Sequence, residues 1–220
     1  MIFILLFYNL DFQKSQIEPM NDLPQIGKIA PNFLTVGVYK NRLGKIRLSD
    51  YHGKKYVIVV FYPANFTAVS PTELIGLSDR ISEFRDLSTQ ILAISIDSPF
   101  SHLHYLLSKR DQGGLSDLNY PLVSDLNQTI TKKYGLLTND GLALPGLFII
   151  DKEGIIQYYT VNNLLCGRSI NELIRILKSI QYIKENPGYA CPVDWEYGQQ
   201  PLSSHPLKSK VYFQTLYSNN

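Results

Sequence analysis

Two short apolar runs on either side of a helical pattern constrain this chain more than any other feature. Residues 57–61 and 91–96 are almost entirely apolar, as in strands buried on both faces of a sheet. Between them, large apolar residues recur at the spacing of one helix face: Leu74, Leu77, Ile81 and Phe84. Strand, helix and strand in this order predict a βαβ unit with a right-handed crossover.

Hairpins and further helices surround this unit. Hairpins are expected within 33–48 and 147–161, the second around the turn at 151–154. Helices are expected after Ser98, over 125–134, and after Ser169, which forms a capping-box pattern with Glu172. These elements predict an α/β chain with a thioredoxin-like fold, in which helices flank a mixed central sheet.

The predicted organisation is one domain over 20–186 and a C-terminal tail over 187–220. Residues 1–19 form an N-terminal extension, or else Met20 is the true initiator. The apolar start at 1–8 is too short to span a bilayer, and it lacks the cationic start and cleavage site of a signal peptide.

Composition narrows the function classes. A chain of 220 residues is long enough for one well-buried domain. The net charge is +2, and lysines and arginines are scattered between acids, so no nucleic-acid surface is indicated. No membrane partner is expected either. Two cysteines do not make a disulfide framework and favour a reducing compartment. The four histidines are scattered, so neither a metal site nor a cofactor is expected.

The segment 61–73 carries the pattern most suggestive of chemistry. An apolar strand leads through Pro63 and a short polar loop to a helix start, which places Ser70 in or near the first helical turn. Free backbone N–H groups and the helix dipole favour negative charge there, so a cysteine at this position would be a low-pKa thiolate. Ser70 can also be read as an N-cap, because Ser70-Pro71-Thr72-Glu73 has the form of a capping box.

Motifs along most of the chain resemble those of the typical 2-Cys peroxiredoxins. They are Ile29-Ala30-Pro31-Asn32-Phe33, the segment 61–73 with Pro63 and Thr67 at the family spacing, Gly113-Gly114-Leu115-Ser116, Gly146-Leu147-Phe148-Ile149-Ile150-Asp151, Gly167-Arg168-Ser169 and Cys191-Pro192-Val193-Asp194-Trp195. The sequence is similar in particular to the plastid-encoded peroxiredoxins of algae. This resemblance implies a location in the plastid (chloroplast) stroma, with the cytoplasm as the alternative.

The resemblance also implies roles for individual residues. In the family, a thiolate at the position of Ser70 attacks peroxide, shielded by Pro63 and assisted by the Thr67 hydroxyl. Two arginines stabilise the anion; one matches Arg168, and the position of the other holds Pro145. Cys191 matches the resolving cysteine, which forms an intersubunit disulfide that thioredoxin reduces. Members form homodimers and often decamers, so a homodimer is expected.

Two readings of function remain open at this stage. One is an antioxidant enzyme with a redox-active centre: a thioredoxin-dependent peroxidase that reduces hydrogen peroxide and alkyl hydroperoxides. The other is a non-enzymatic scaffold, holdase or mixed-ring subunit. A serine hydroxyl is not ionised near neutral pH without a positioned base, and oxygen cannot form a sulfenic acid. The replacements at Ser70 and Pro145 therefore predict lost or vestigial peroxidase activity. Cys166 is expected to be a small buried apolar residue.

Overall fold

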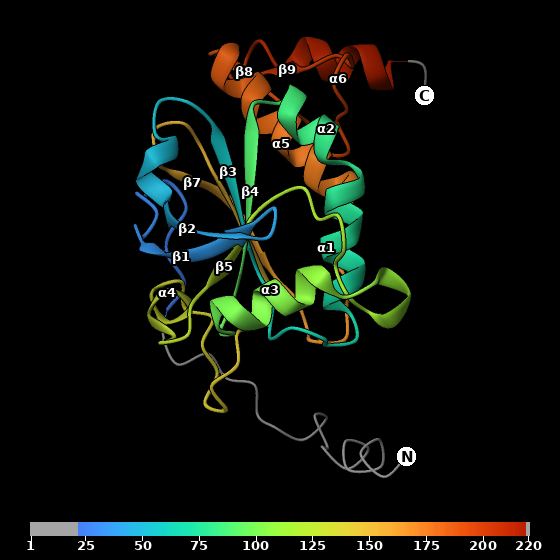
Figure 1. The fold of residues 1–220 in the computed structure, drawn as a ribbon. Coiled ribbons are helices and arrows are strands. Elements are labelled where there is room, and N and C mark those ends of the chain that lie inside the picture. Colours follow the sequence, from blue (N-terminus) through green and yellow to red (C-terminus); the bar gives the residue numbers. More distant parts are fainter. Residues whose placement is uncertain (1–21, 219–220) are drawn as a thin grey trace.

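The computed structural model describes residues 22–218, and in it helices cover both faces of a mixed sheet (Figure 1). The sheet of this region has seven strands in the order β2-β1-β5-β4-β3-β6-β7. Their bounds are β1 Leu34–Tyr39, β2 Arg42–Arg47, β3 Tyr56–Phe61, β4 Thr89–Ser95, β5 Leu122–Ser124, β6 Gly146–Ile150 and β7 Ile156–Val161. The strands β3, β4 and β5 are parallel, and all other pairs are antiparallel. The expected mixed central sheet flanked by helices is confirmed.

The predicted βαβ unit is present, but its helix is divided. β3 pairs in parallel with β4 from Tyr56 opposite Thr89 to Phe61 opposite Ile94. The connection consists of α1 Ser70–Asp79 and α2 Ile81–Asp86, which are separated at Arg80, where φ is −105° and ψ is 20°. Both helices bury their apolar residues against the same face of the sheet. The apolar spacing therefore continues across the break and could not reveal it.

Two apolar layers hold the helices to the sheet. One lies under α1, α2, α3 Pro99–Leu107 and α5 Ile170–Glu185. The other lies on the opposite face, under α4 Thr129–Lys133, and includes the ring contacts of Phe61, Tyr134 and Phe148. Two short 3-10 helices, η1 Leu48–Tyr51 and η2 Arg110–Gln112, complete the connections. The neighbouring strands β3 and β4 are buried along nearly their whole length, as their apolar runs predict.

Two of the predicted helix caps are present. Ser98 and Ser169 are N-caps, and their hydroxyls accept the backbone N–H of Ser101 and Glu172. The helix expected over 125–134 is shorter, because the Asp125 carboxylate accepts the N–H groups of Ile130 and Thr131. These bonds occupy the free donors of a helix that begins only at Thr129.

The β6–β7 turn is fixed by a buried carboxylate. Asp151 is almost fully buried and accepts the backbone N–H of Glu153 and Ile155 and the side-chain amide of Gln157. Lys184 of α5 reaches the same carboxylate at 2.7 Å. Burial raises the pKa of Asp151, but hydrogen bonds from Lys184, Ile155 and Gln157 outweigh it, so the pKa is lowered overall.

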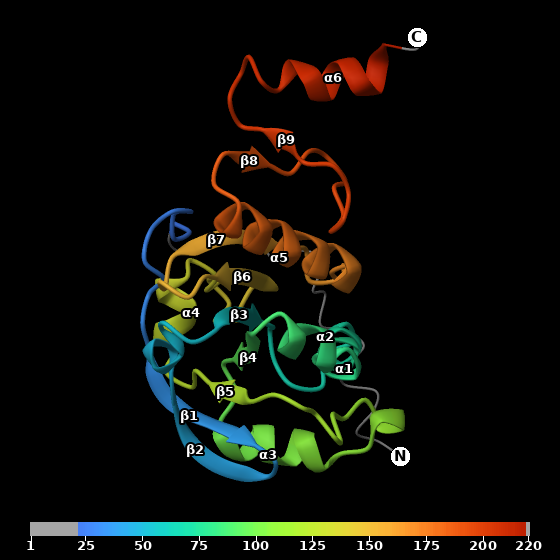
Figure 2. The ribbon, with the colours of Figure 1, turned by 90° about the horizontal axis from the view of Figure 1, so that it is seen from above.

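The tail extends away from this body (Figure 2). It contains a two-stranded hairpin, β8 Tyr189–Ala190 with β9 Leu202–Ser203, and the helix α6 Lys210–Tyr217. Trp195 anchors its base: the indole is buried against Tyr182 of α5, with ring centroids 4.8 Å apart, and donates to the Gln199 carbonyl. The boundary proposed at residue 187 lies just after α5, while the extension at 1–19 falls outside the described residues. Between residues 22 and 218, no helix is both long and apolar enough to cross a bilayer.

Candidate active site around Ser70

The loop that precedes α1 is held by buried polar side chains. Asn65 donates its backbone N–H to the Asp97 carboxylate at 2.8 Å and its side-chain amide to Ser101 at 2.8 Å. Its amide oxygen accepts the Tyr62 hydroxyl at 2.9 Å. Pro63 is buried at the start of the same loop. The loop is therefore tied to both β4 and α3, and this fixes where α1 begins.

Ser70 is the first residue of α1 and is buried, with 4% of its surface exposed. Val69 is the N-cap residue, and no side chain caps this helix start. The capping-box interpretation of Ser70 and Glu73 is therefore wrong. The alternative, that Ser70 lies within the first turn, is confirmed. At this position the backbone N–H groups of the first turn still favour a negative charge at the side chain.

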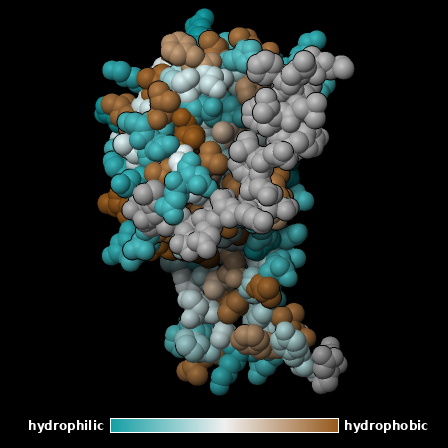
Figure 3. All heavy atoms as spheres, turned by 90° about the horizontal axis from the view of Figure 1, so that it is seen from below, coloured by the Kyte–Doolittle hydropathy of each residue, from teal (hydrophilic) through white to brown (hydrophobic). Residues whose placement is uncertain are grey.

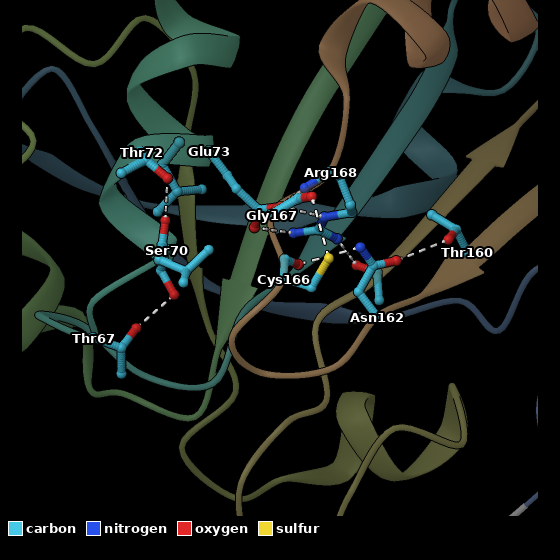
Figure 4. Close-up of polar contacts among 12 residues, drawn as sticks. Thr67, Ser70, Thr72, Glu73, Thr160, Asn162, Cys166, Gly167 and Arg168 are labelled. Atoms are coloured by element: carbon cyan, nitrogen blue, oxygen red, sulfur yellow. Dashed lines mark hydrogen bonds and ion pairs between the residues drawn. The ribbon is translucent and has the colours of Figure 1, made fainter.

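The Ser70 hydroxyl has one partner, which is another hydroxyl. Ser70 Oγ lies 2.5 Å from Thr67 Oγ1, and Thr67 Oγ1 donates to the Ala64 carbonyl at 2.9 Å (Figure 4). Thr67 has a single hydroxyl proton, and a carbonyl can only accept, so Ser70 must be the donor to Thr67. No described carboxylate or imidazole hydrogen-bonds Ser70 to take up its proton. The hydroxyl is therefore held in place without being activated.

A buried histidine, His102, contacts this loop but does not hydrogen-bond Ser70. His102 lies within hydrogen-bond distance of Asn65, Tyr62 and the Val123 carbonyl. Burial lowers its pKa, against the opposing charge of Asp97, so the imidazole is neutral at pH 7. His102 supports the loop rather than Ser70.

Arg168 is positioned by Glu73, one turn along α1 from Ser70. Its Nε and Nη2 donate to the two Glu73 oxygens at 2.8 and 2.6 Å, and its backbone N–H also donates to Glu73. Nη1 donates to the Gly146 carbonyl at 2.8 Å. Both side chains are almost buried, at 10% and 9% exposure. Figure 4 shows this pair beside Ser70 and Thr67, and within residues 22–218 no hydrogen bond joins the two pairs.

Pro145 completes the surroundings from β6. It is buried directly before that strand, and its carbonyl accepts the backbone N–H of Asn162 at 2.9 Å. A proline ring offers no hydrogen-bond donor. Of the two cationic groups implied by the resemblance, only Arg168 is therefore present, and its guanidinium is already paired.

Both cysteines are free thiols, and Figure 4 shows Cys166 in the same region as Arg168. Cys191 follows β8, which lies at the opposite end of the molecule from the first turn of α1 (Figure 1). Its thiol is half-buried 3.9 Å from the Ser179 carbonyl. Burial raises the Cys191 pKa, despite the opposing effects of Ser179 and Arg175. Cys166 is exposed, so the expectation of a buried apolar role for it is wrong.

Comparison with known proteins agrees with this geometry. The AhpC/TSA family model matches residues 26–159, which is more than half of the chain. The chain belongs to the peroxiredoxin family. It is 78% identical to the ycf42 protein of Trieres chinensis, which is named as a peroxiredoxin, over 90% of this chain and 98% of that protein. It is 51% identical to the chloroplastic 2-Cys peroxiredoxin BAS1 of Arabidopsis thaliana, over 89% of this chain and 74% of that protein.

Solved peroxiredoxin structures share the fold. The reduced 2-Cys peroxiredoxin of Plasmodium vivax superposes with a TM-score of 0.84 at 34% identity, covering 87% of this chain and all of the other. This confirms the thioredoxin-like fold as well as the family. At the level of the family, the associated function is peroxide reduction.

Sequence reasoning missed two residues of this peroxiredoxin site. The local sequence indicates Glu73 only as part of a helix cap, and it indicates no role for Asn65. Their partners Arg168 and Asp97 are 95 and 32 positions away along the chain. A signal for Glu73 is present in the local sequence, because Glu73 is three residues from Ser70 and therefore lies on the same side of the helix.

Proposed function

We propose that this peroxiredoxin has lost its own peroxidase activity and acts as a non-catalytic member of the family. The observation that carries the proposal is the Ser70 hydroxyl, which donates to Thr67 and which no carboxylate or imidazole between residues 22 and 218 hydrogen-bonds. Peroxide reduction at this position needs a thiolate that attacks the O–O bond and becomes a sulfenic acid. A serine oxygen provides neither the anion nor the oxidisable atom.

The expected loss is large. Removing the nucleophile of other enzymes lowers turnover by on the order of 10⁶. The Arg168 guanidinium is occupied by Glu73 and Gly146, and Pro145 provides no second cation. Peroxide bound here would therefore lack both a nucleophile and one of the charge-assisted donors that stabilise developing negative charge.

A homodimer, and as a larger form a decamer, is the proposed assembly. The tail supports this because it carries exposed apolar side chains well away from the body of the protein (Figure 3). In α6, for example, Val211 and Tyr217 are 62% and 63% exposed. Apolar surface of this kind is typical of protein interfaces. A holdase and a subunit of mixed rings with an active relative are the two roles that such an assembly permits.

The proposed location is the plastid stroma, with the cytoplasm as the alternative. Its support is that similar relatives from Arabidopsis thaliana and Spinacia oleracea are named as chloroplastic. A thioredoxin-type reductant and a peroxide substrate would be involved only if some activity remains. Cys191 is the thiol that matches the resolving cysteine of the family, and its raised pKa argues against a reactive thiolate at that position.

The decisive experiment measures peroxide consumption with a thioredoxin system. The wild type is compared with Ser70→Cys and with the double variant Ser70→Cys, Pro145→Arg. We expect an inert wild type and turnover in the double variant, which would locate the loss in these two positions. Peroxide consumption by the wild type that disappears in Cys191→Ala would overturn the proposal and assign the chemistry to Cys191.

A further inference from the structure

The β1–β2 hairpin concentrates positive charge in a protein that is otherwise nearly neutral. Residues 34–49 contain four cations and no Asp or Glu, although the net charge of the whole chain is only +2. All four side chains are exposed, and no described carboxylate forms an ion pair with any of them. They are Lys40, Arg42, Lys45 and Arg47. The low net charge of the whole chain therefore does not reveal this local excess of positive charge.

Apolar side chains share a face of the hairpin with two of these cations. In the antiparallel register Leu34 is opposite Arg47 and Val36 is opposite Lys45, and residues paired in this way point to the same side. Leu34 and Val36 are 52% and 37% exposed. We call Leu34, Val36, Lys45 and Arg47 the cationic-apolar face. Its aliphatic side chains on β1 lie beside its cations on β2, at the edge of the sheet (Figure 1).

Protection of a sheet edge explains only part of this arrangement. Natural edge strands often carry lysine to prevent pairing with other chains, and β2 is an edge strand. That role accounts for cations on β2. It does not account for exposed Leu34 and Val36 on β1, which is an inner strand, or for the lack of any acid among residues 34–49.

We propose that the cationic-apolar face binds the surface of an anionic lipid membrane. Lysine and arginine would contact the lipid head groups, and Leu34 and Val36 would enter the boundary with the acyl chains, as in other peripheral proteins. A second copy placed with the same face against this one is disfavoured, because Lys45 and Arg47 would face the same two cations of the other copy. A nucleic acid would satisfy the charges but would leave the two aliphatic side chains against a polar backbone.

The test is co-sedimentation of the full-length protein with vesicles. One set contains phosphatidylglycerol and phosphatidylcholine, and the other contains phosphatidylcholine alone. We expect binding to the anionic vesicles only, with a loss of binding as salt is raised, since the Debye length shortens from about 10 Å at 0.1 M to about 3 Å at 1 M. This salt titration uses the unaltered protein and therefore needs no variant to fold.

Two charge-matched variants locate the surface. In Lys45→Glu, Arg47→Glu we expect the partition coefficient to fall by at least about 30-fold, since each lost cation near an anionic surface is worth a factor of about five. The control Lys208→Glu, Lys210→Glu changes the net charge equally at two exposed positions of the tail, and its binding should stay near that of the wild type. Leu34→Ser, Val36→Ser should weaken the binding that remains at intermediate salt.

Three results would overturn the proposal. The first is equal binding to both kinds of vesicle. The second is an equal loss in the hairpin and tail variants, which would make the effect one of net charge. The third is tight binding to single-stranded RNA without binding to vesicles, which would identify a nucleic-acid surface instead. Circular dichroism of each variant shows that the sheet is intact before binding is compared.

Discussion

The buried pair of Glu73 and Arg168 leads to the most quantitative prediction. In Arg168→Met, the Glu73 carboxylate keeps its buried position and its hydrogen bond from the backbone N–H of residue 168, but it loses the two hydrogen bonds from Nε and Nη2. The Gly146 carbonyl loses its donor as well. Removing one partner of a buried pair destabilises proteins by about 3–5 kcal/mol. For a chain of this size, that lowers the melting temperature by roughly 6–20 °C.

The assay is urea unfolding of Arg168→Met, Glu73→Gln and the double variant. Because the double variant leaves no unpaired charge, we expect it to be more stable than the sum of the single losses indicates, with a coupling of about 1–3 kcal/mol. The matched control is the exposed pair of Glu172 and Arg175 on α5, where Glu172→Gln should change stability by less than about 1 kcal/mol. A loss in Arg168→Met no larger than this control, or additive single effects, would refute the reasoning.

Three further predictions concern acid stability, thiol reactivity and the tail. The pKa of Asp151 is lowered in the folded protein, so its contribution to stability is present above its unfolded-state pKa and is lost as pH falls through the folded-state value. Below about pH 4, the free energy of unfolding should therefore fall more steeply with decreasing pH in the wild type than in Asp151→Asn. Iodoacetamide at pH 8 should label exposed Cys166 before Cys191, whose pKa is raised, and mass spectrometry of the two peptides checks the order. Trp195→Ala should destabilise the protein by about 3–5 kcal/mol in urea unfolding and should expose the tail to limited proteolysis, because the indole is buried against α5.

Most of the fold followed from the sequence because its signals are local. The apolar runs of β3 and β4, the turns of the two hairpins and the cap of α5 each depend on residues close together in the chain. The helix boundaries that the sequence does not predict correctly depend on side-chain hydrogen bonds or on tertiary packing. Asp125 occupies the donors that a longer α4 would have used, and α1 and α2 share one buried face although the backbone breaks at Arg80. Periodicity reports which face is buried and not whether the helix is continuous.

The site was predicted less completely, because its contacts join distant segments. Motif spacing identified Thr67, Ser70 and Arg168, but it could not show that the guanidinium is bound by Glu73. The exposure of Cys166 could not be predicted either, because a side chain in the loop between a strand and a helix can point into the protein or into solvent. Such choices depend on packing that is absent from the local sequence.

The contacts of Thr67 and Arg168 give these two family residues a structural role as well as the catalytic one that the resemblance implies. Thr67 bonds the Ala64 carbonyl, and Arg168 joins α1 to the start of β6 through Glu73 and Gly146. Each of these residues therefore has a structural reason to persist that does not involve peroxide. Ser70 and Pro145 occupy the two positions where the resemblance implies groups needed for chemistry, and neither replacement leaves the loop or the strand without support. This pattern is what we expect if, as proposed above, peroxidase turnover has been lost while the fold has been maintained. The stability cycle at Glu73 and Arg168 tests the first half of this argument, and peroxide turnover in the Ser70→Cys, Pro145→Arg variant tests the second.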